Sequence, residues 1–185
     1  GEIILDNLFT NEGMREGRDY DKEETLRDEM GNVMTNEDTS KRMRPDYILH
    51  YPDGNDVVID SKVVLTAADD YFRATDEQSK ADAMARNLAA IKEQVRNLSK
   101  KDYSRYLQAG YNKLNFVIMY IHTEGALNLA LLNDTSLWRE AYDMGVLILG
   151  PQTMYMNLRI LELMWTQVRQ LHNQEDMMRA ANQII

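Results

Sequence analysis

The chain has 185 residues, of which 44% are apolar and 28% are charged, and this is the composition of one ordinary globular domain. It has no cysteine, which excludes disulfides, zinc–thiolate sites and cysteine nucleophiles. Its formal net charge of −9 excludes a protein that coats nucleic acid by charge alone, and its longest apolar run, 116–121, is far shorter than the roughly 20 residues of a membrane helix.

The first third of the chain contains one helix and the clearest local pattern. A helix is expected over 2–10 and an irregular strand over 20–26, whereas the polar stretch 27–41 is expected to form a loop. Two β-type runs, 45–51 and 55–63, flank the sequence Pro-Asp-Gly. Because proline presets the first turn position and glycine accepts a left-handed third position, this pattern predicts a β-hairpin.

The remainder of the chain alternates helices with strands. Helices are expected over 66–99 with a break near Thr75, over 126–144 in one or two pieces, and from Pro151 onward; buried strands are expected over 114–121 and 146–149. This order predicts an α/β fold with one mixed central sheet flanked by helices. We expect a single domain over 1–185, excised from a longer chain because it begins with glycine rather than methionine.

Three side chains of the predicted hairpin are expected to converge on one face. A three-residue turn over 52–54 places residues 51 and 55 opposite each other, and counting back along the ladder places Asp46 opposite Asp60. Lys62, two residues after Asp60, projects to the same face. Opposed residues have Cβ atoms roughly 5 Å apart, which suits two carboxylates that share one cation. Because facing like charges destabilise an ordinary sheet, this placement predicts a site.

The residue types at this site indicate its chemistry. Asp46 and Asp60 are candidate ligands of Mg²⁺ or Mn²⁺, because oxygen ligands select hard divalent ions. Such an ion lowers the pKa of bound water and polarises a phosphate, while the Lys62 ammonium can orient that water or stabilise the developing charge. This arrangement suits hydrolysis of a phosphodiester bond. The alternative for an Asp-x-Lys triplet at the end of a strand is a surface ion pair.

The same residues resemble a known family. Pro45-Asp46 followed by Asp60-Ser61-Lys62 matches the PD-(D/E)xK pattern of the restriction-endonuclease-like nuclease fold. Segments along nearly the whole chain resemble the RmuC family of bacterial DNA recombination proteins; they are 13–17, 44–46, 58–63, 97–103, 124–126 and 151–153. The resemblance implies an endonuclease-like core, a divalent metal and DNA as the substrate. It also implies that Glu2 is the acidic residue which the first helix contributes to the site.

The resemblance also implies a cellular context. The family's usual anatomy places a hydrophobic anchor and a long coiled coil before this domain, and the parent chain is expected to oligomerise through that coiled coil. The domain itself is therefore expected to be a bacterial cytoplasmic fragment that makes no membrane contact.

Basic residues along the long central helix are the predicted DNA-binding surface. Seven basic and two acidic residues lie between 86 and 113. Lys92, Arg96 and Lys100 recur every four residues, so they share one side of the helix, and Lys101 follows them. Arg44, just before the first aspartate of the site, can hold phosphate near the metal or pair with the nearby carboxylates. A solvated helix face is the alternative for the basic stripe.

Two classes of function stay open from these residues. The first is a metal-dependent DNA nuclease in which Asp46 and Asp60 hold the ion, Lys62 is the catalytic cation and Glu2 assists. The second is a DNA-binding or scaffolding domain that retains the nuclease fold without cleaving DNA. Glu124 directly follows a buried strand, where it is either a functional group or a helix cap.

Overall fold

The computed structural model describes residues 2–22, 30–33, 35, 44–61, 65–101, 112–113 and 116–184. Its helices are α1 (Glu2–Asn11), α2 (Thr66–Arg73), α3 (Glu77–Lys101), α4 (Glu124–Asn133), α5 (Leu137–Asp143) and α6 (Pro151–Asn182). Its strands are β1 (Tyr20–Lys22), β2 (Tyr47–His50), β3 (Asn55–Asp60), β4 (Asn112–Lys113), β5 (Val117–Tyr120) and β6 (Val146–Leu149). This alternation confirms the predicted α/β fold, including the break between α2 and α3.

The strands form one mixed sheet. Its order is β1-β2-β3-β5-β6, with the short β4 also pairing with β3. The pairs β1/β2 and β2/β3 are antiparallel, whereas β3/β5 and β5/β6 are parallel. Parallel neighbours need long crossover connections, and here α2 with α3 joins β3 to β5, while α4 with α5 joins β5 to β6. All of β5 is buried, as expected for a central strand that is covered on both faces.

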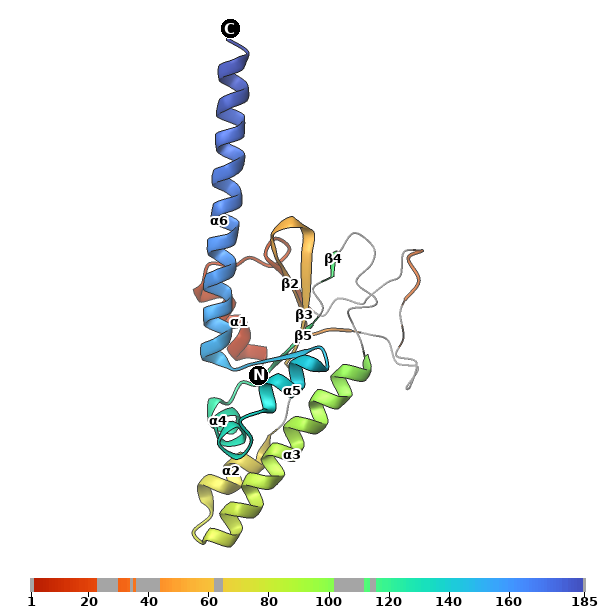
Figure 1. Cartoon of the computed structure of the whole chain (residues 1–185), viewed down its shortest axis with the longest axis vertical. Coiled ribbons are helices and arrows are strands. Elements are labelled where there is room, and N and C mark those ends of the chain that lie inside the picture. Colours follow the sequence, from red (N-terminus) through yellow and green to blue (C-terminus); the bar gives the residue numbers. More distant parts are fainter. Residues whose placement is uncertain are drawn as a thin grey trace.

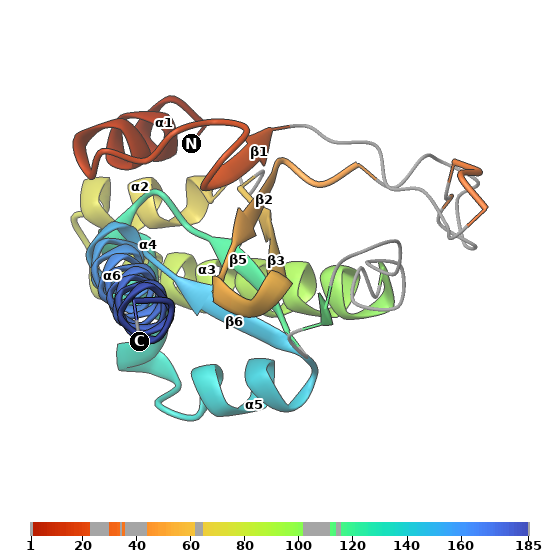
Figure 2. The same ribbon diagram turned by 90° about the horizontal axis from the view of Figure 1, so that it is seen from above.

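Helices cover both faces of this sheet (Figure 1). Side chains of α1 and α6 build one apolar core against the sheet, and side chains of α3, α4 and α5 build another on the opposite face. In the view from above in Figure 2, α1 lies beside β1 and α3 passes behind the strands. The result is a sheet buried between two helical layers, with α2 packed against α3 and α4.

The buried face of α3 departs from the predicted stripe in its first half. Met84 and Leu88 were expected to be buried but are half-exposed. In this half the buried residues are Ala83, which is short, and Asn87, which is polar. In the second half the buried residues are Ile91, Val95 and Leu98, as predicted. The Asn87 amide donates to the carbonyl of Ala126 at 2.8 Å. The Asn87 bond therefore fixes this half of α3 against α4.

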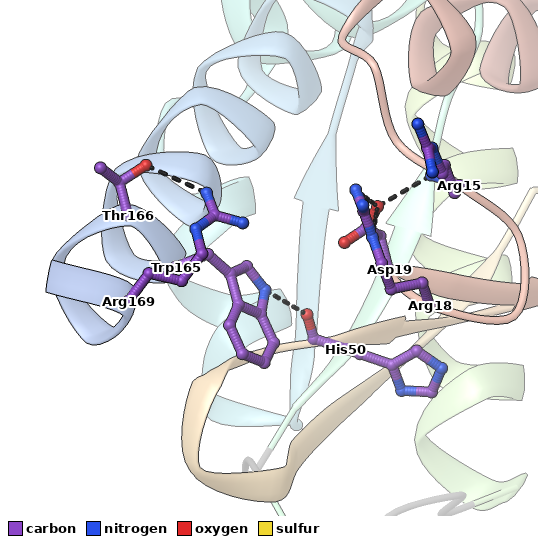
Figure 3. A network of polar contacts seen from close by, with 7 residues as sticks. All are labelled: Arg15, Arg18, Asp19, His50, Trp165, Thr166 and Arg169. Atoms are coloured by element: carbon purple, nitrogen blue, oxygen red, sulfur yellow. Dashed lines mark hydrogen bonds and ion pairs between the residues drawn. The ribbon is translucent and has the colours of Figure 1, made fainter. Parts of the chain in front are cut away.

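The two halves of α6 have different surroundings. In the first half Met154, Leu158 and Leu161 are buried, and the indole N–H of Trp165 donates to the carbonyl of His50 at 3.3 Å (Figure 3). In the second half residues 170–184 are all exposed, and the helix projects from the body with the C-terminus at its tip (Figure 1). Within the described ranges, no helix is both long and apolar enough to cross a bilayer.

Candidate functional site

The hairpin that carries the two predicted ligands has the predicted register. The N–H of Tyr51 donates to the carbonyl of Asn55 at 2.7 Å, and Gly54 closes the turn with φ of 71°. A positive φ of this size is accessible to glycine at little cost. Along the ladder Tyr47 pairs with Ile59, so the next pair outward is formed by residues 46 and 60. The prediction that two aspartates face each other at the end of this hairpin is therefore supported by the observed register.

Both aspartates belong to the face of the sheet that α3 covers. Ile48 and Val58 pair with each other and lie in the apolar core that α3 builds. Asp46 and Asp60 stand two residues further along the same strands, and strand side chains alternate between faces. In agreement, Nζ of Lys101 in the last turn of α3 lies 3.8 Å from Oδ2 of Asp60.

Asp46 is a buried and oriented carboxylate. It is 3% exposed. Its Oδ2 accepts the backbone N–H of Ser61 at 2.7 Å and the Ser61 hydroxyl at 3.1 Å. Because Ser61 directly follows Asp60, these bonds fix the first carboxylate beside the end of β3. A carboxylate held in this way needs little reordering to receive a ligand.

Asp60 is more accessible and is compensated more loosely. Its side chain is 15% exposed, and the 3.8 Å to the Lys101 ammonium is at the long end of an ion pair. Lys101 was predicted as a DNA-binding residue, which stays a prediction, and its ammonium lies within reach of a predicted metal ligand. The same ammonium can therefore serve as a counter-charge for Asp60 or as a phosphate contact, but it cannot do both at full strength.

Two predicted catalytic residues are not settled by this geometry. Lys62 lies outside the described residues, and only the backbone of Glu2, at the start of α1, is described. Within the described part of the chain no group of three His, Cys, Asp or Glu side chains is arranged to hold a metal. The donors that this part supplies are the two carboxylates, whose oxygens suit Mg²⁺ or Mn²⁺. The metal and the roles of Lys62 and Glu2 stay predictions.

One residue of the predicted basic stripe on α3, Lys92, forms ion pairs with acidic residues of the same chain. Nζ of Lys92 lies 2.6 Å from Oδ2 of Asp134 and 3.6 Å from Oε2 of Glu140. Lys92 donates this hydrogen bond to Asp134, and the bond raises the pKa of Lys92 and lowers the pKa of Asp134 to about 2. Lys92 thus ties α3 to the segment that joins α4 and α5, which is a structural use of its charge.

The other predicted DNA-binding residues are exposed. Arg96 pairs with Glu93 within the helix at 2.8 Å, and such surface pairs leave a guanidinium available to a ligand. Lys100 and Arg44 are exposed at the end of α3 and just before Asp46. Their contact with DNA stays a prediction, and its geometry favours the end of α3 over the middle of the helix.

A second polar cluster on the same hairpin was not predicted. Nδ1 of His50 lies 2.7 Å from Oδ1 of Asp56, and Nε2 of His50 lies 2.9 Å from Oδ2 of Asp21. The hydrogen bond to Asp56 is the main cause that raises the pKa of His50 to about 9. The ladder count that pairs residues 46 and 60 also pairs 50 with 56, so the sequence contained the pattern that could have found this cluster.

Glu124 acts on a distant helix. Its Oε1 accepts the backbone N–H of Gln152 at 2.6 Å, in the first turn of α6. A carboxylate is favourable there because the first N–H groups of a helix have no partner within the helix. A Cβ at Gly150 would lie 2.8 Å from both carboxylate oxygens, so the Glu124 side chain would have to shift if residue 150 carried a side chain. Of the two interpretations from the sequence, the cap is confirmed, although the capped helix is α6 and not the helix that Glu124 begins.

Comparison with known proteins decides the family. Residues 1–185 match the RmuC family. The chain is 33% identical over 173 residues to a DNA recombination protein RmuC homologue of Vibrio cholerae. The aligned region covers 94% of this chain and 32% of that protein. It is 31% identical over 184 residues to the DNA recombination protein RmuC of Escherichia coli K12, covering 100% of this chain and 36% of that protein. The chain belongs to the RmuC family.

The family match concerns one part of a longer architecture. A homologue from Neisseria meningitidis serogroup B is 36% identical over 174 residues, with 94% of this chain and 28% of that protein covered. The chain therefore spans about a third of the length of the RmuC relatives it matches. No solved structure matches this chain.

Two buried polar groups lie at the same edge of this RmuC-family sheet as the aspartates. Asp60 pairs with Met119, so the carboxyl ends of β3 and β5 are neighbours. The hydroxyl of Tyr120 and Nδ1 of His122 are buried here without a hydrogen-bond partner in the described part of the structure. Burial raises the pKa of Tyr120 to about 12 and lowers the pKa of His122. Tyr120 belongs to the apolar core on the α1 and α6 face, so its hydroxyl lies on the opposite side of the sheet from Asp46 and Asp60.

Proposed function

We propose that this chain is a metal-dependent DNA nuclease domain that hydrolyses phosphodiester bonds in the course of DNA recombination. The observation that carries the proposal is the pairing register that brings Asp46 and Asp60 to one end of one hairpin face. Two facing acids are unfavourable in a sheet unless a cation lies between or beside them. The names of the RmuC relatives, which connect those proteins with DNA recombination, supply the substrate class.

The side chains divide the work of such a site. Asp46, oriented by Ser61, and the more accessible Asp60 would hold Mg²⁺ or Mn²⁺. When bound, that ion lowers the pKa of its water and polarises the phosphate. Lys62 would supply the cation that orients the nucleophile or stabilises the charge of the transition state. Glu2 would complete the acidic set from the first turn of α1.

The end of α3 and the residue before Asp46 would hold the DNA backbone. Lys100 and Arg44 are exposed there, and Lys101 lies beside Asp60. Phosphate contacts of this kind position a nucleic acid without reading its sequence. A local group of cations also allows a chain with net charge −9 to approach DNA.

The second candidate function is a DNA-binding or scaffolding domain that does not cleave. One observation favours it: both carboxylates already have partners in the protein, Ser61 for Asp46 and Lys101 for Asp60. In this alternative the aspartates hold the end of the hairpin together, and Lys101 balances Asp60 permanently.

Calorimetric titration with Mn²⁺, followed by cleavage of end-labelled single-stranded and duplex DNA, separates the two candidates. The Asp60→Asn variant is expected to lose Mn²⁺ binding and to lower the cleavage rate at least about 100-fold. Lys62→Ala is expected to keep Mn²⁺ binding and to lose cleavage. Asp69→Asn, an exposed acid on α2, is the matched control and should behave as the unmodified chain.

The alternative predicts a different set of results. The non-cleaving function is supported if the chain binds DNA but neither binds Mn²⁺ nor cleaves any substrate. In that case Asp60→Asn should leave DNA binding unchanged. Cleavage that persists in Asp60→Asn would place the reaction elsewhere in the chain.

A further inference from the structure

A small cavity lies between α6 and the loop that joins α1 to β1. Its volume is about 100 Å³. Trp165 and Arg169 of α6 line one side, and Arg18 and Asp19 of the loop line the other (Figure 3). The apolar residues of the lining belong to the core on the α1 and α6 face of the sheet, whereas the two aspartates of the proposed metal site lie on the face that α3 covers. The cavity is therefore separate from that site.

Both sides of the cavity are fixed to one residue of β2. The backbone N–H of His50 donates to the carbonyl of Asp19 at 2.9 Å, and the carbonyl of His50 accepts the indole N–H of Trp165 at 3.3 Å. The loop is also closed on itself, because the Asp19 carboxylate accepts the backbone N–H of Arg15 at 2.8 Å. Walls that are held in this way need little ordering when a ligand binds, and this lowers the entropic cost of binding.

Each acid that lines the cavity has a guanidinium beside it. Nη2 of Arg18 lies 2.7 Å from Oδ2 of Asp19. Nη1 of Arg159 lies 3.7 Å from Oε2 of Glu12 and 2.7 Å from Oε2 of Glu162. The charges of these acids are therefore compensated within the chain, although a carboxylate with one such partner still has acceptor sites to offer a ligand.

Arg169 differs from these residues. In the described part of the chain its guanidinium makes no ion pair, and its hydrogen bond to the hydroxyl of Thr166 is long at 3.3 Å. The residue is exposed. A guanidinium carries five N–H donors in a fixed plane, a geometry that matches a phosphate. Arg169 is therefore available to the phosphate of a ligand in the cavity.

Three different functional groups follow one another along α6. Glu162, Trp165 and Arg169 are three and four residues apart, so they share one side of the helix. They supply a hydrogen-bond acceptor, a flat ring and a cation over about 10 Å of helix. The indole is half-buried, and the buried Leu158 and Leu161 line the same cavity. This order of groups matches a ligand that has a hydrogen-bond donor, a planar ring and an anion.

We propose that this cavity binds one nucleoside monophosphate group, with its base against Trp165, its phosphate at Arg169 and an amino group of the base donating to Glu162. An enclosed cavity of about 150 Å³ holds benzene, so a space of this size suits one small ring and not a fused pair. A carboxylate accepts from the amino group of cytosine, whereas thymine has a carbonyl at that position. A cytosine nucleotide is therefore the expected ligand, either free or within a single strand of DNA.

Calorimetric titration of the intact chain in EDTA tests the ligand. Deoxycytidine monophosphate is expected to bind at least about tenfold more tightly than deoxycytidine or inorganic phosphate, because each of these fragments makes only part of the contacts. It is also expected to bind at least about threefold more tightly than thymidine monophosphate. Because EDTA removes divalent metal, the result does not depend on whether the chain cleaves DNA. Failure to bind the nucleotide, or equal binding of phosphate alone, overturns the proposal.

Variants on α6 locate the binding. Arg169→Gln is expected to weaken binding of the nucleotide at least about tenfold, because it removes the charged contact to phosphate. Arg179→Gln removes the same charge from the exposed end of α6 and should bind as the unmodified chain does. Glu162→Ala should remove the preference for cytosine over thymine without weakening the binding of thymidine monophosphate. Equal affinities of the two arginine variants would contradict the proposed site.

A single-stranded oligonucleotide of deoxycytidine distinguishes the two sources of the nucleotide. If Arg169→Gln weakens the oligonucleotide and the free nucleotide alike, the cavity receives a nucleotide of a DNA strand. If Arg169→Gln weakens the free nucleotide alone, the ligand is the free nucleotide. Either result supports the site, whereas an oligonucleotide and a nucleotide that are both indifferent to Arg169→Gln would contradict it.

Discussion

The acidic residues at the two ends of one hairpin face differ in how their charges are compensated. At one end His50 holds Asp56 at 2.7 Å and Asp21 at 2.9 Å, so an imidazolium joins three strands. At the other end Asp46 faces Asp60, and the Lys101 ammonium at the end of α3 lies 3.8 Å from Oδ2 of Asp60. Both ends lie on the face that α3 covers, and they are built from the same two strands.

The difference separates an acid that is buried under short hydrogen bonds from an acid that stays partly exposed, as the proposed metal site requires. Asp56 accepts a short hydrogen bond from the imidazolium of His50, and its side chain is only 4% exposed, so little of the carboxylate is left for another ligand. A long ion pair to the end of a helix leaves Asp60 partly exposed and able to exchange its partner. The pairing register tells where the acidic residues lie. The distance from each carboxylate to its compensating cation indicates whether the carboxylate is tied up in the fold.

The largest expected effect comes from removing one acid at each end. Asp56→Ala is expected to lower the free energy of unfolding by about 2–3 kcal/mol, because it leaves a mostly buried imidazolium with one carboxylate. Asp60→Ala is expected to change it by less than about 0.5 kcal/mol, because the lost ion pair is long and the repulsion with Asp46 is relieved. Urea unfolding at neutral pH measures both. Equal costs at the two ends would remove the distinction between them.

The second effect is a pH dependence that belongs to His50. Its pKa is about 9 in the folded protein against 6.5 for an ordinary histidine, so the folded state binds more protons between these values. The stabilisation is therefore complete below the ordinary pKa and is lost as the pH rises through about 9, on the order of 1–2 kcal/mol because the ring keeps some contact with solvent. Unfolding free energies from about pH 6 to about pH 10 should show this fall.

Two histidine variants assign this pH dependence. His50→Gln should flatten the curve across that range, because no imidazolium then bridges the two acids. His172→Gln, on the exposed half of α6, should retain the curve of the unmodified chain. A curve that is unchanged in His50→Gln would place the titrating group elsewhere.

The smallest effect concerns the ligand end and depends on the proposed metal site. Lys101→Met is expected to raise the affinity for Mn²⁺ roughly threefold to tenfold, because the ammonium near Asp60 competes with the metal. Calorimetric titration measures the affinity, and Lys100→Met is the matched control on the same helix turn. An affinity that does not change in Lys101→Met would mean that the ammonium is no competitor.

The sequence was sufficient for most of the fold because local and global preferences agree in this chain. The turn residues at 52–54 fixed the hairpin register, and apolar runs without polar interruption identified β5 and β6 as buried strands. The burial of α3 was predicted for the half that packs on the sheet. In the other half the predicted Met84 and Leu88 are only partly buried, and Asn87, a polar residue, is buried through its bond to a carbonyl of α4. A hydrophobicity pattern does not contain that bond.

The candidate site was predictable in its register but not in its charge balance. Counting along the ladder was enough to place Asp46 opposite Asp60. The partners of the basic residues depend on tertiary packing: Lys92 meets Asp134 across 42 positions, and Lys101 meets Asp60 from the end of a helix. Spacing along one helix places cations on a common side, but it does not tell which of them a distant acid has already engaged.

The contact between Glu124 and the start of α6 holds the helix at its base, so a small change in direction there moves the far end by a large distance. The helix has 32 residues, so it is about 48 Å long at 1.5 Å per residue. A change of about 10° in its direction at Gln152 would move its tip by about 8 Å. A side chain at Gly150 would meet the glutamate carboxylate, which would have to shift away from its present position at the start of α6. The Glu124 carboxylate, together with the buried side chains of Met154, Leu158 and Leu161, thus sets the direction in which the far end of α6 points.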